Sequence, residues 1–186
     1  MNFANKLTML RILMVPVLIL CFYLPLSFNM WLATVVFILA SITDALDGRY
    51  ARKHNLCSDF GRFLDPIADK LLVCSAFIML VEFKSFPAVL TFLFIGREFI
   101  ISGFRLVAAK GGTVIAAGIT GKIKTVFQCI AIPFWLLKDE WIFNFAPVMT
   151  TVFLICMWAV TAVALIASVY SCAEYLYKNR KVISFK

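Results

Sequence analysis

The chain has 186 residues and is strongly apolar: 63% of its residues are hydrophobic, only 15% are charged, and the mean hydropathy is +0.95. Soluble domains are roughly 45–50% apolar. A chain of this length cannot hide so much apolar surface from water, so a soluble globular protein is excluded. The net charge of +8 does not indicate nucleic-acid binding, because no soluble basic module is present to carry it.

Six apolar segments are long enough to cross a bilayer as helices, which takes about 20 residues each. In chain order they are 9–27, 30–50, 63–83, 87–109, 122–138 and 145–177. We also expect a short interfacial helix over residues 1–11. The second and last segments should continue as helices beyond the hydrocarbon. The pattern predicts one all-α integral membrane domain, residues 1–186, with six transmembrane helices.

The basic residues are distributed unevenly between the two sides of the membrane. With six spans, both termini and the second and fourth connections share one side, and most lysines and arginines outside the spans fall there. The opposite side holds only Lys84 and Lys138. Cytoplasmic connections of membrane proteins carry excess Lys and Arg, so we predict that both termini are cytoplasmic.

Four aspartates form the most informative pattern in the chain. Asp44 and Asp47 are three residues apart, and Asp65 and Asp69 are four apart. Each spacing places two carboxylates on one face of a helix. Clustered acids near a membrane repel one another unless a cation binds them, and oxygen ligands suit Mg²⁺ or Mn²⁺. The alternative is that the acids only form salt bridges with the neighbouring arginines Arg49, Arg52 and Arg62.

Small residues accompany the aspartates. Gly48 and Gly61 lie in or beside the same helices, where glycine costs about 1 kcal/mol relative to alanine. They indicate either close approach of a ligand to the backbone or tight helix packing. Ala51 lies one turn after Gly48, and Arg52 follows with a guanidinium suited to phosphate.

The combined pattern D-x-x-D-G-x-x-A-R, eight residues, then G-x-x-x-D-x-x-x-D, resembles the signature of the CDP-alcohol phosphatidyltransferase family. Every signature position is present in this chain. Four further segments resemble the branch of the family that makes phosphatidylglycerol phosphate: Asn5–Arg11, Ile95–Glu98, Arg105 and Gly118–Thr125.

This resemblance implies a six-helix membrane domain with a polar cavity open to the cytoplasm, commonly a homodimer, in the bacterial cytoplasmic membrane. It implies transfer of a phosphatidyl group from CDP-diacylglycerol to an alcohol, with release of CMP. In this branch the alcohol is sn-glycerol 3-phosphate.

The resemblance also implies roles for individual residues. Two divalent ions, Mg²⁺ or Mn²⁺, would be bound by Asp44, Asp47, Asp65 and Asp69. Asp69 would also be the general base, and the CDP part would be held by Asp44, Gly48, Ala51, Arg52, Asp59 and Gly61. The acceptor phosphate would be held by Arg105, Lys122 and Lys124, for which the alternative is ordinary cytoplasmic charge. We expect Arg97 to line the cavity. Because adjacent residues on a helix do not face each other, we expect Arg97 and Glu98 to have separate partners.

Three alternative functions stay open. The same family includes enzymes with other acceptors: inositol phosphate, serine, or phosphatidylglycerol in a cardiolipin synthase. A transporter would also carry charges in its spans, although no inverted repeat is visible here. An inactive membrane scaffold is the third, and the complete set of aspartates argues against it.

Overall fold

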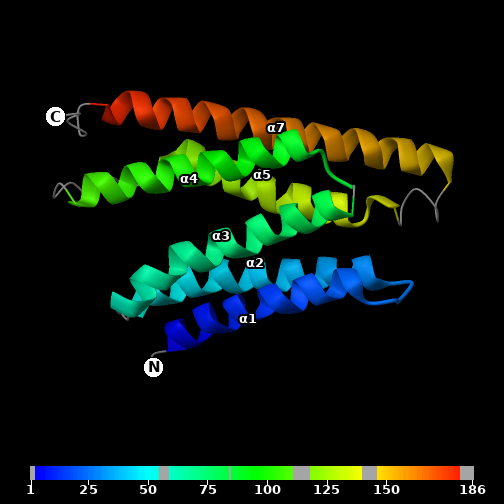
Figure 1. The fold of residues 1–186 in the computed structure, drawn as a ribbon, viewed down its shortest axis with the longest axis horizontal. Helices are drawn as coiled ribbons and strands as arrows, with labels where there is room; N and C mark the ends of the chain where they lie inside the picture. The colour runs from blue at the N-terminus through cyan, green and yellow to red at the C-terminus, as the bar shows by residue number, and fades with distance from the viewer. Residues whose placement is uncertain (1–2, 55–58, 84, 111–117, 140–145, 181–186) are drawn as a thin grey trace. The chain divides into compact units, whose positions relative to one another are not determined.

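The computed structural model describes residues 3–54, 59–83, 85–110, 118–139 and 146–180, without the side chains of 3–7, 44–54, 59–66 and 110. Within these residues the regular structure is entirely helical (Figure 1), which confirms the expected all-α class. The helices are α1 (Phe3–Tyr23), α2 (Asn29–His54), α3 (Asp59–Glu82), α4 (Ala88–Lys110), α5 (Ile119–Leu136) and α7 (Pro147–Asn179).

Each expected apolar segment falls on one of these helices, but the start of the chain differs from the expectation. A separate interfacial helix is not observed in the described residues, because α1 runs without a break from Phe3 to Tyr23. No glycine or proline separates the expected interfacial helix from the first expected span. The first proline, Pro16, lies inside the helix. The helix ends just before the Leu24–Pro25 pair, since a residue preceding proline disfavours helical geometry.

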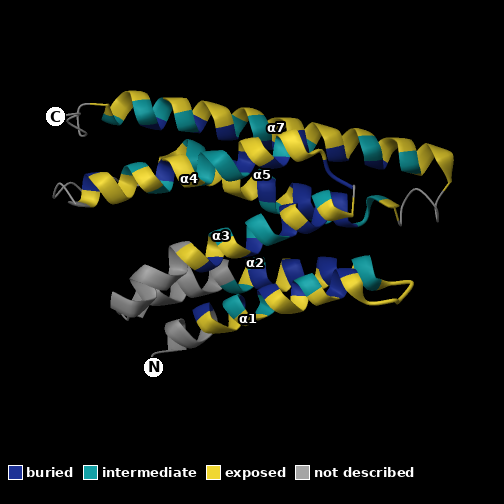
Figure 2. Ribbon diagram, in the orientation of Figure 1, coloured by how far each residue is buried: buried dark blue, intermediate teal, exposed yellow. Residues whose placement is uncertain are grey.

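The chain forms two compact units. Unit 1 consists of Met1–Phe86 and Ile132–Pro147. Within it, α1 packs against both α2 and α3. Buried residues are dark blue in Figure 2, and the fully buried residues of α2 and α3 include Ala33, Ala68 and Ala76. Small residues let membrane helices approach closely.

Unit 2 consists of Pro87–Ala131 and Val148–Lys186. Its longest element is α7, whose buried residues recur every three or four positions: Phe153, Met157, Thr161, Ala164, Ser168, Ser171 and Tyr175. The first part of this buried stripe is mostly apolar, and the last part carries hydroxyl groups. Unit 2 therefore has a polar interior near the end of α7.

Many large apolar side chains are exposed (yellow in Figure 2), among them Phe92, Leu106, Ile119 and Val148. In the described residues, α7 is long and apolar enough to cross a membrane. Only 28% of its most apolar window is buried, unlike the core helix of a soluble protein. Shorter apolar stretches occur at Thr8–Tyr23 and Asn29–Thr43. This exposure suits a protein whose solvent is partly lipid.

Candidate active site

The carboxylate pairs lie on two consecutive helices of unit 1. Asp44 and Asp47 belong to α2, and Asp65 and Asp69 belong to α3. The helical backbone therefore gives each pair the common face that the sequence predicts. The side chains of most of these site candidates are outside the described set: Asp44, Asp47, Gly48, Ala51, Arg52, Asp59, Gly61 and Asp65.

Asp69 is the one aspartate of the four whose side chain is described. Its side chain is 50% exposed, and its Oδ1 accepts a hydrogen bond from Nη1 of Arg11 at 2.7 Å. Arg11 comes from α1 and is only 1% exposed. The sequence analysis placed Arg11 in a segment that resembles one branch of the family, but it gave this residue no partner and no role in the site. A signal was present, because Thr8 and Arg11 are polar residues three apart in an otherwise apolar stretch, which predicts one buried polar face.

The residues present fit a divalent metal site by their chemistry. All four candidates offer carboxylate oxygens, the donors that Mg²⁺ and Mn²⁺ prefer. Among the described side chains, no three His, Cys, Asp or Glu residues come together. The further carboxylates that the sequence offers for such a site, Asp44, Asp47 and Asp65, have side chains outside the described set.

Unit 2 contains a pocket of about 210 Å³ with a basic lining. Its charged residues are Arg97 and Arg105 from α4, and Glu174 and Lys178 from α7. Thr120 and Gly121 of α5 also line it. A pocket with three cations and one acid favours an anionic ligand.

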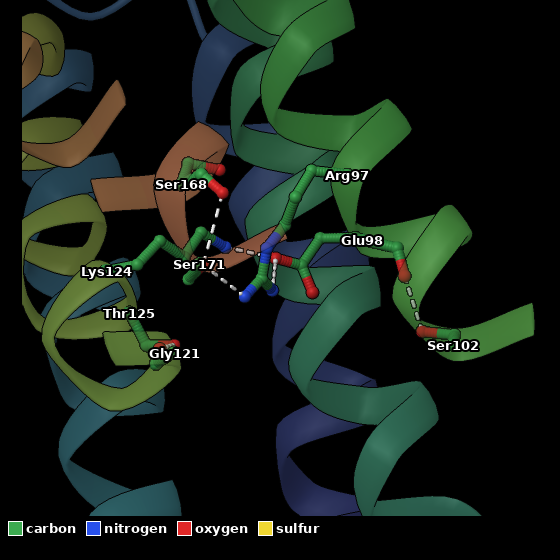
Figure 3. A network of polar contacts seen from close by, with 8 residues as sticks. All are labelled: Arg97, Glu98, Ser102, Gly121, Lys124, Thr125, Ser168 and Ser171. Carbon is green, nitrogen blue, oxygen red and sulfur yellow. Dashed lines mark hydrogen bonds and ion pairs between the residues drawn. The ribbon is translucent and has the colours of Figure 1, made fainter. Parts of the chain in front are cut away.

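A largely buried polar network joins α4, α5 and α7 (Figure 3), and it shares Arg97 and Ser171 with the pocket lining. Arg97 donates through Nη2 to Oγ of Ser171 at 2.8 Å, and its Nη1 lies 3.2 Å from Oε1 of Glu98. Lys124 of α5 donates to the same Glu98 oxygen and is only 3% exposed. The expectation that Arg97 and Glu98 have separate partners is therefore wrong in part. Each has its own further partner, but their long side chains bend toward each other and pair directly.

Arg105 is held against the aromatic end of α7. Its Nε donates to the hydroxyl of Tyr175 at 3.3 Å, and its guanidinium carbon lies 5.3 Å from the centre of that ring. Phe104 packs edge-on against the same ring at 5.7 Å. Cation–π contact and hydrogen bond together restrict the guanidinium to one place on the pocket wall.

The other two acceptor candidates lie differently. Lys122 is exposed, and Lys124 is buried in the Glu98 network; neither is among the described residues that line the pocket. Two charged lining residues, Glu174 and Lys178, were missed by the sequence analysis. Glu174 accepts hydrogen bonds from Thr120 at 2.9 Å and from Lys178 at 2.5 Å. The sequence held a signal for the pairing of these two residues, because Glu174 and Lys178 are four positions apart on one helix.

Comparison with known proteins agrees with this arrangement. A sequence model of the family described as CDP-alcohol phosphatidyltransferase matches residues 1–173. The chain belongs to the CDP-alcohol phosphatidyltransferase family. Its exposed apolar surface agrees with this membership, because the family is membrane-associated.

Three relatives of this phosphatidyltransferase illustrate its similarity to known proteins. A Bacillus subtilis (strain 168) protein is 43% identical over 150 residues, which cover 74% of this chain and 78% of the relative. A Rickettsia felis protein is 40% identical, covering 75% and 77%, and an Escherichia coli K12 protein is 38% identical, covering 73% and 76%. All three are named CDP-diacylglycerol–glycerol-3-phosphate 3-phosphatidyltransferase.

The family match ends before the last turns of α7. Glu174, Tyr175 and Lys178, which line the basic pocket, lie beyond residue 173. The matched part of this phosphatidyltransferase therefore includes the carboxylate helices and the α4 and α5 walls of the pocket, but of the α7 lining it includes only Ser171.

Proposed function

We propose that this phosphatidyltransferase transfers the phosphatidyl group of CDP-diacylglycerol to sn-glycerol 3-phosphate, forming phosphatidylglycerol phosphate and CMP. The observation that carries the proposal is the match to relatives of that name, at 38–43% identity over about three quarters of the chain. The two carboxylate pairs on α2 and α3 supply the chemistry that the reaction needs.

In unit 1, Asp44, Asp47, Asp65 and Asp69 hold two divalent ions, Mg²⁺ or Mn²⁺. When bound, such ions would supply positive charge to balance the negative charge that develops on the pyrophosphate. The CDP part is held by Asp44, Gly48, Ala51, Arg52, Asp59 and Gly61. The small residues admit the ligand close to the helix backbone, and Arg52 offers a guanidinium to a phosphate.

Asp69 acts as the general base. It takes the proton of the acceptor hydroxyl, and the oxygen then attacks the phosphorus that carries diacylglycerol. A new P–O bond forms to the acceptor while the P–O bond to CMP breaks, so CMP leaves with the bonding electrons. The half-exposed side chain of Asp69 supports this role, because a base must reach its substrate.

In unit 2, the basic pocket holds the phosphate of glycerol 3-phosphate. Arg105 and Arg97 are its main ligands, because both line the pocket and both are fixed by other side chains. Lys124 contributes indirectly by holding Glu98, and Lys122 attracts anionic groups from the surface. We thus assign direct binding of the acceptor phosphate to the two arginines and only indirect roles to the two lysines.

The enzyme is proposed to be a multi-pass protein of the bacterial cytoplasmic membrane, with six spans, both termini in the cytoplasm and a polar cavity open to that side. The uneven distribution of basic residues supports this orientation. We further propose a homodimer, the state that family membership suggests.

The test is CMP release by the purified protein in detergent, supplied with CDP-diacylglycerol and Mg²⁺. Glycerol 3-phosphate should support release, while inositol phosphate, serine and phosphatidylglycerol should not. Release with one of these other acceptors only would overturn the acceptor assignment. If folded protein releases no CMP with any acceptor, the assignment of transferase activity is overturned.

A further inference from the structure

The ion pair between Arg11 and Asp69 joins a buried cation to a half-exposed carboxylate. The two residues are 58 positions apart in the chain, and Nη1 of Arg11 lies 2.7 Å from Oδ1 of Asp69. The exposures are very unequal, at 1% for Arg11 and 50% for Asp69. We infer that Arg11 is a positioning residue that fixes the Asp69 carboxylate for its role in the reaction, an inference that rests on the proposed function.

The unequal burial distinguishes this pair from one that only stabilises the fold. An ion pair buried on both sides neutralises two charges inside the protein, often with no net gain in stability. Here the carboxylate stays accessible, and the cation beneath it is the buried partner. Desolvating a guanidinium is costly, so a buried arginine needs a compensating role, and holding Asp69 provides one.

The surrounding helices make Arg11 a rigid support. It lies on α1, the helix that packs against both carboxylate helices, α2 and α3. Thr8, one turn earlier on the same face of α1, is also buried. On α3, the neighbour Ala68 is fully buried and Leu72 is nearly so, which places Asp69 at the edge of the packed face. Arg11 contacts this edge from the buried side of α1.

The chemistry of the guanidinium suits the task. It is planar, permanently charged and a donor only, so it fixes the direction of an accepting oxygen without ever competing for its proton. A carboxylate has two oxygens with about four acceptor sites. Arg11 occupies one of these acceptor sites, on Oδ1. Loss of Arg11 removes this hydrogen bond and so relaxes the orientation of the Asp69 carboxylate.

The experiment compares purified Arg11→Gln and Arg11→Lys with the wild type. Displacement of a reacting group by a fraction of an ångström is costly, so kcat should fall about tenfold or more in Arg11→Gln. The KM for CDP-diacylglycerol should change little. Arg11→Lys should have a kcat between those of the wild type and Arg11→Gln, because lysine keeps the positive charge but lacks the planar guanidinium. Lys138→Gln, which removes an ion-paired cation elsewhere in unit 1, serves as the control and should keep kcat.

A second readout does not depend on turnover. Mn²⁺ binding, measured by electron paramagnetic resonance, should weaken about tenfold in Arg11→Gln, as when the partner of a metal ligand is lost. The same substitution in an Asp69→Asn background should have no further effect. An equal shift in both backgrounds, or wild-type kcat in Arg11→Gln, would overturn the inference. Failure of both Arg11 variants to fold would overturn it too, by assigning the pair a structural role. If the wild type itself releases no CMP, the proposed function fails, while the Mn²⁺ comparison still decides the role of Arg11.

Discussion

At the scale of single residues, the basic pocket shows which of two predicted phosphate-binding cations, Arg105 and Lys122, can contact a ligand inside it. Arg105 and Lys122 both lie near the ends of their helices on the expected cytoplasmic side. Only Arg105 lines the pocket, where Tyr175 fixes its guanidinium. An arginine in this position can bind a phosphate without losing much side-chain freedom.

We predict that Arg105→Gln raises the KM for glycerol 3-phosphate about tenfold or more, because hydrogen bonds to charged groups contribute about 1.5–3 kcal/mol. The KM for CDP-diacylglycerol should stay unchanged. Steady-state kinetics with each substrate varied in turn measures both values. Lys122→Gln is the matched control, with an expected change below about twofold at its exposed position. Equal effects of the two substitutions would contradict the pocket assignment.

The buried network around Glu98 makes a prediction about stability. Glu98→Ala leaves Lys124 buried without its carboxylate, and breaking such a pair costs about 3–5 kcal/mol. The midpoint of thermal unfolding in detergent should fall clearly. Adding Lys124→Met removes the uncompensated charge and should restore much of the loss. A Glu98→Ala variant as stable as the wild type would show that the network does not stabilise the fold.

The sequence predicts residue types and spacing better than residue partners. The two carboxylate pairs follow from local helical spacing, which the structure confirms for the backbone. The Arg11–Asp69 pair depends on how α1 packs against α3, which no local pattern encodes. The burial of Lys124 was also missed, because charge near the end of a span is usually a topology signal.

At the scale of elements, helix ends were predictable where proline marks them. α1 ends before Pro25, α4 begins after Pro87, and α7 begins at Pro147, a residue well suited to the first helical turn. The interfacial helix was expected to end near residue 11, but no proline lies there, and α1 continues past this position. Apolar runs thus predicted the existence of the helices, and local chemistry determined their ends.

The last turns of α7 make a prediction for the C-terminus. Ending the chain after Ala173 removes Glu174, Tyr175 and Lys178 from the pocket but keeps most of the buried stripe of α7. The protein should fold, and its KM for glycerol 3-phosphate should rise about tenfold through loss of charged and hydrogen-bonding groups. Ending the chain after Arg180 instead should leave the kinetics unchanged. If the shorter protein keeps the wild-type KM, the α7 residues do not form the acceptor site.

At the scale of the whole molecule, composition and the lengths of the apolar segments were enough to predict an all-α membrane protein. They were not enough to predict the two units, because each combines segments distant in sequence: unit 1 takes in Ile132–Pro147, and unit 2 takes in Val148–Lys186. Such grouping depends on which helix faces fit together. Lipid-facing and buried helix faces are both apolar, so hydrophobic periodicity gives little information about packing in a membrane.

The proposed orientation can be checked with reporter fusions. Green fluorescent protein attached after Lys186 should fluoresce, and alkaline phosphatase there should be inactive, because both termini are expected in the cytoplasm. Fusions after Asp139, at the connection before α7, should give the reverse pattern. The same result at both positions would contradict the topology.

The most direct test of the central claim is the transfer of labelled sn-glycerol 3-phosphate into lipid by the purified protein, with CDP-diacylglycerol and Mg²⁺. The account predicts that label enters the lipid phase, and that it fails to enter when the metal is chelated or when Asp69→Asn replaces the wild type. Transfer that survives both treatments would contradict the account, because the reaction would then need neither the carboxylate nor the metal assigned to it.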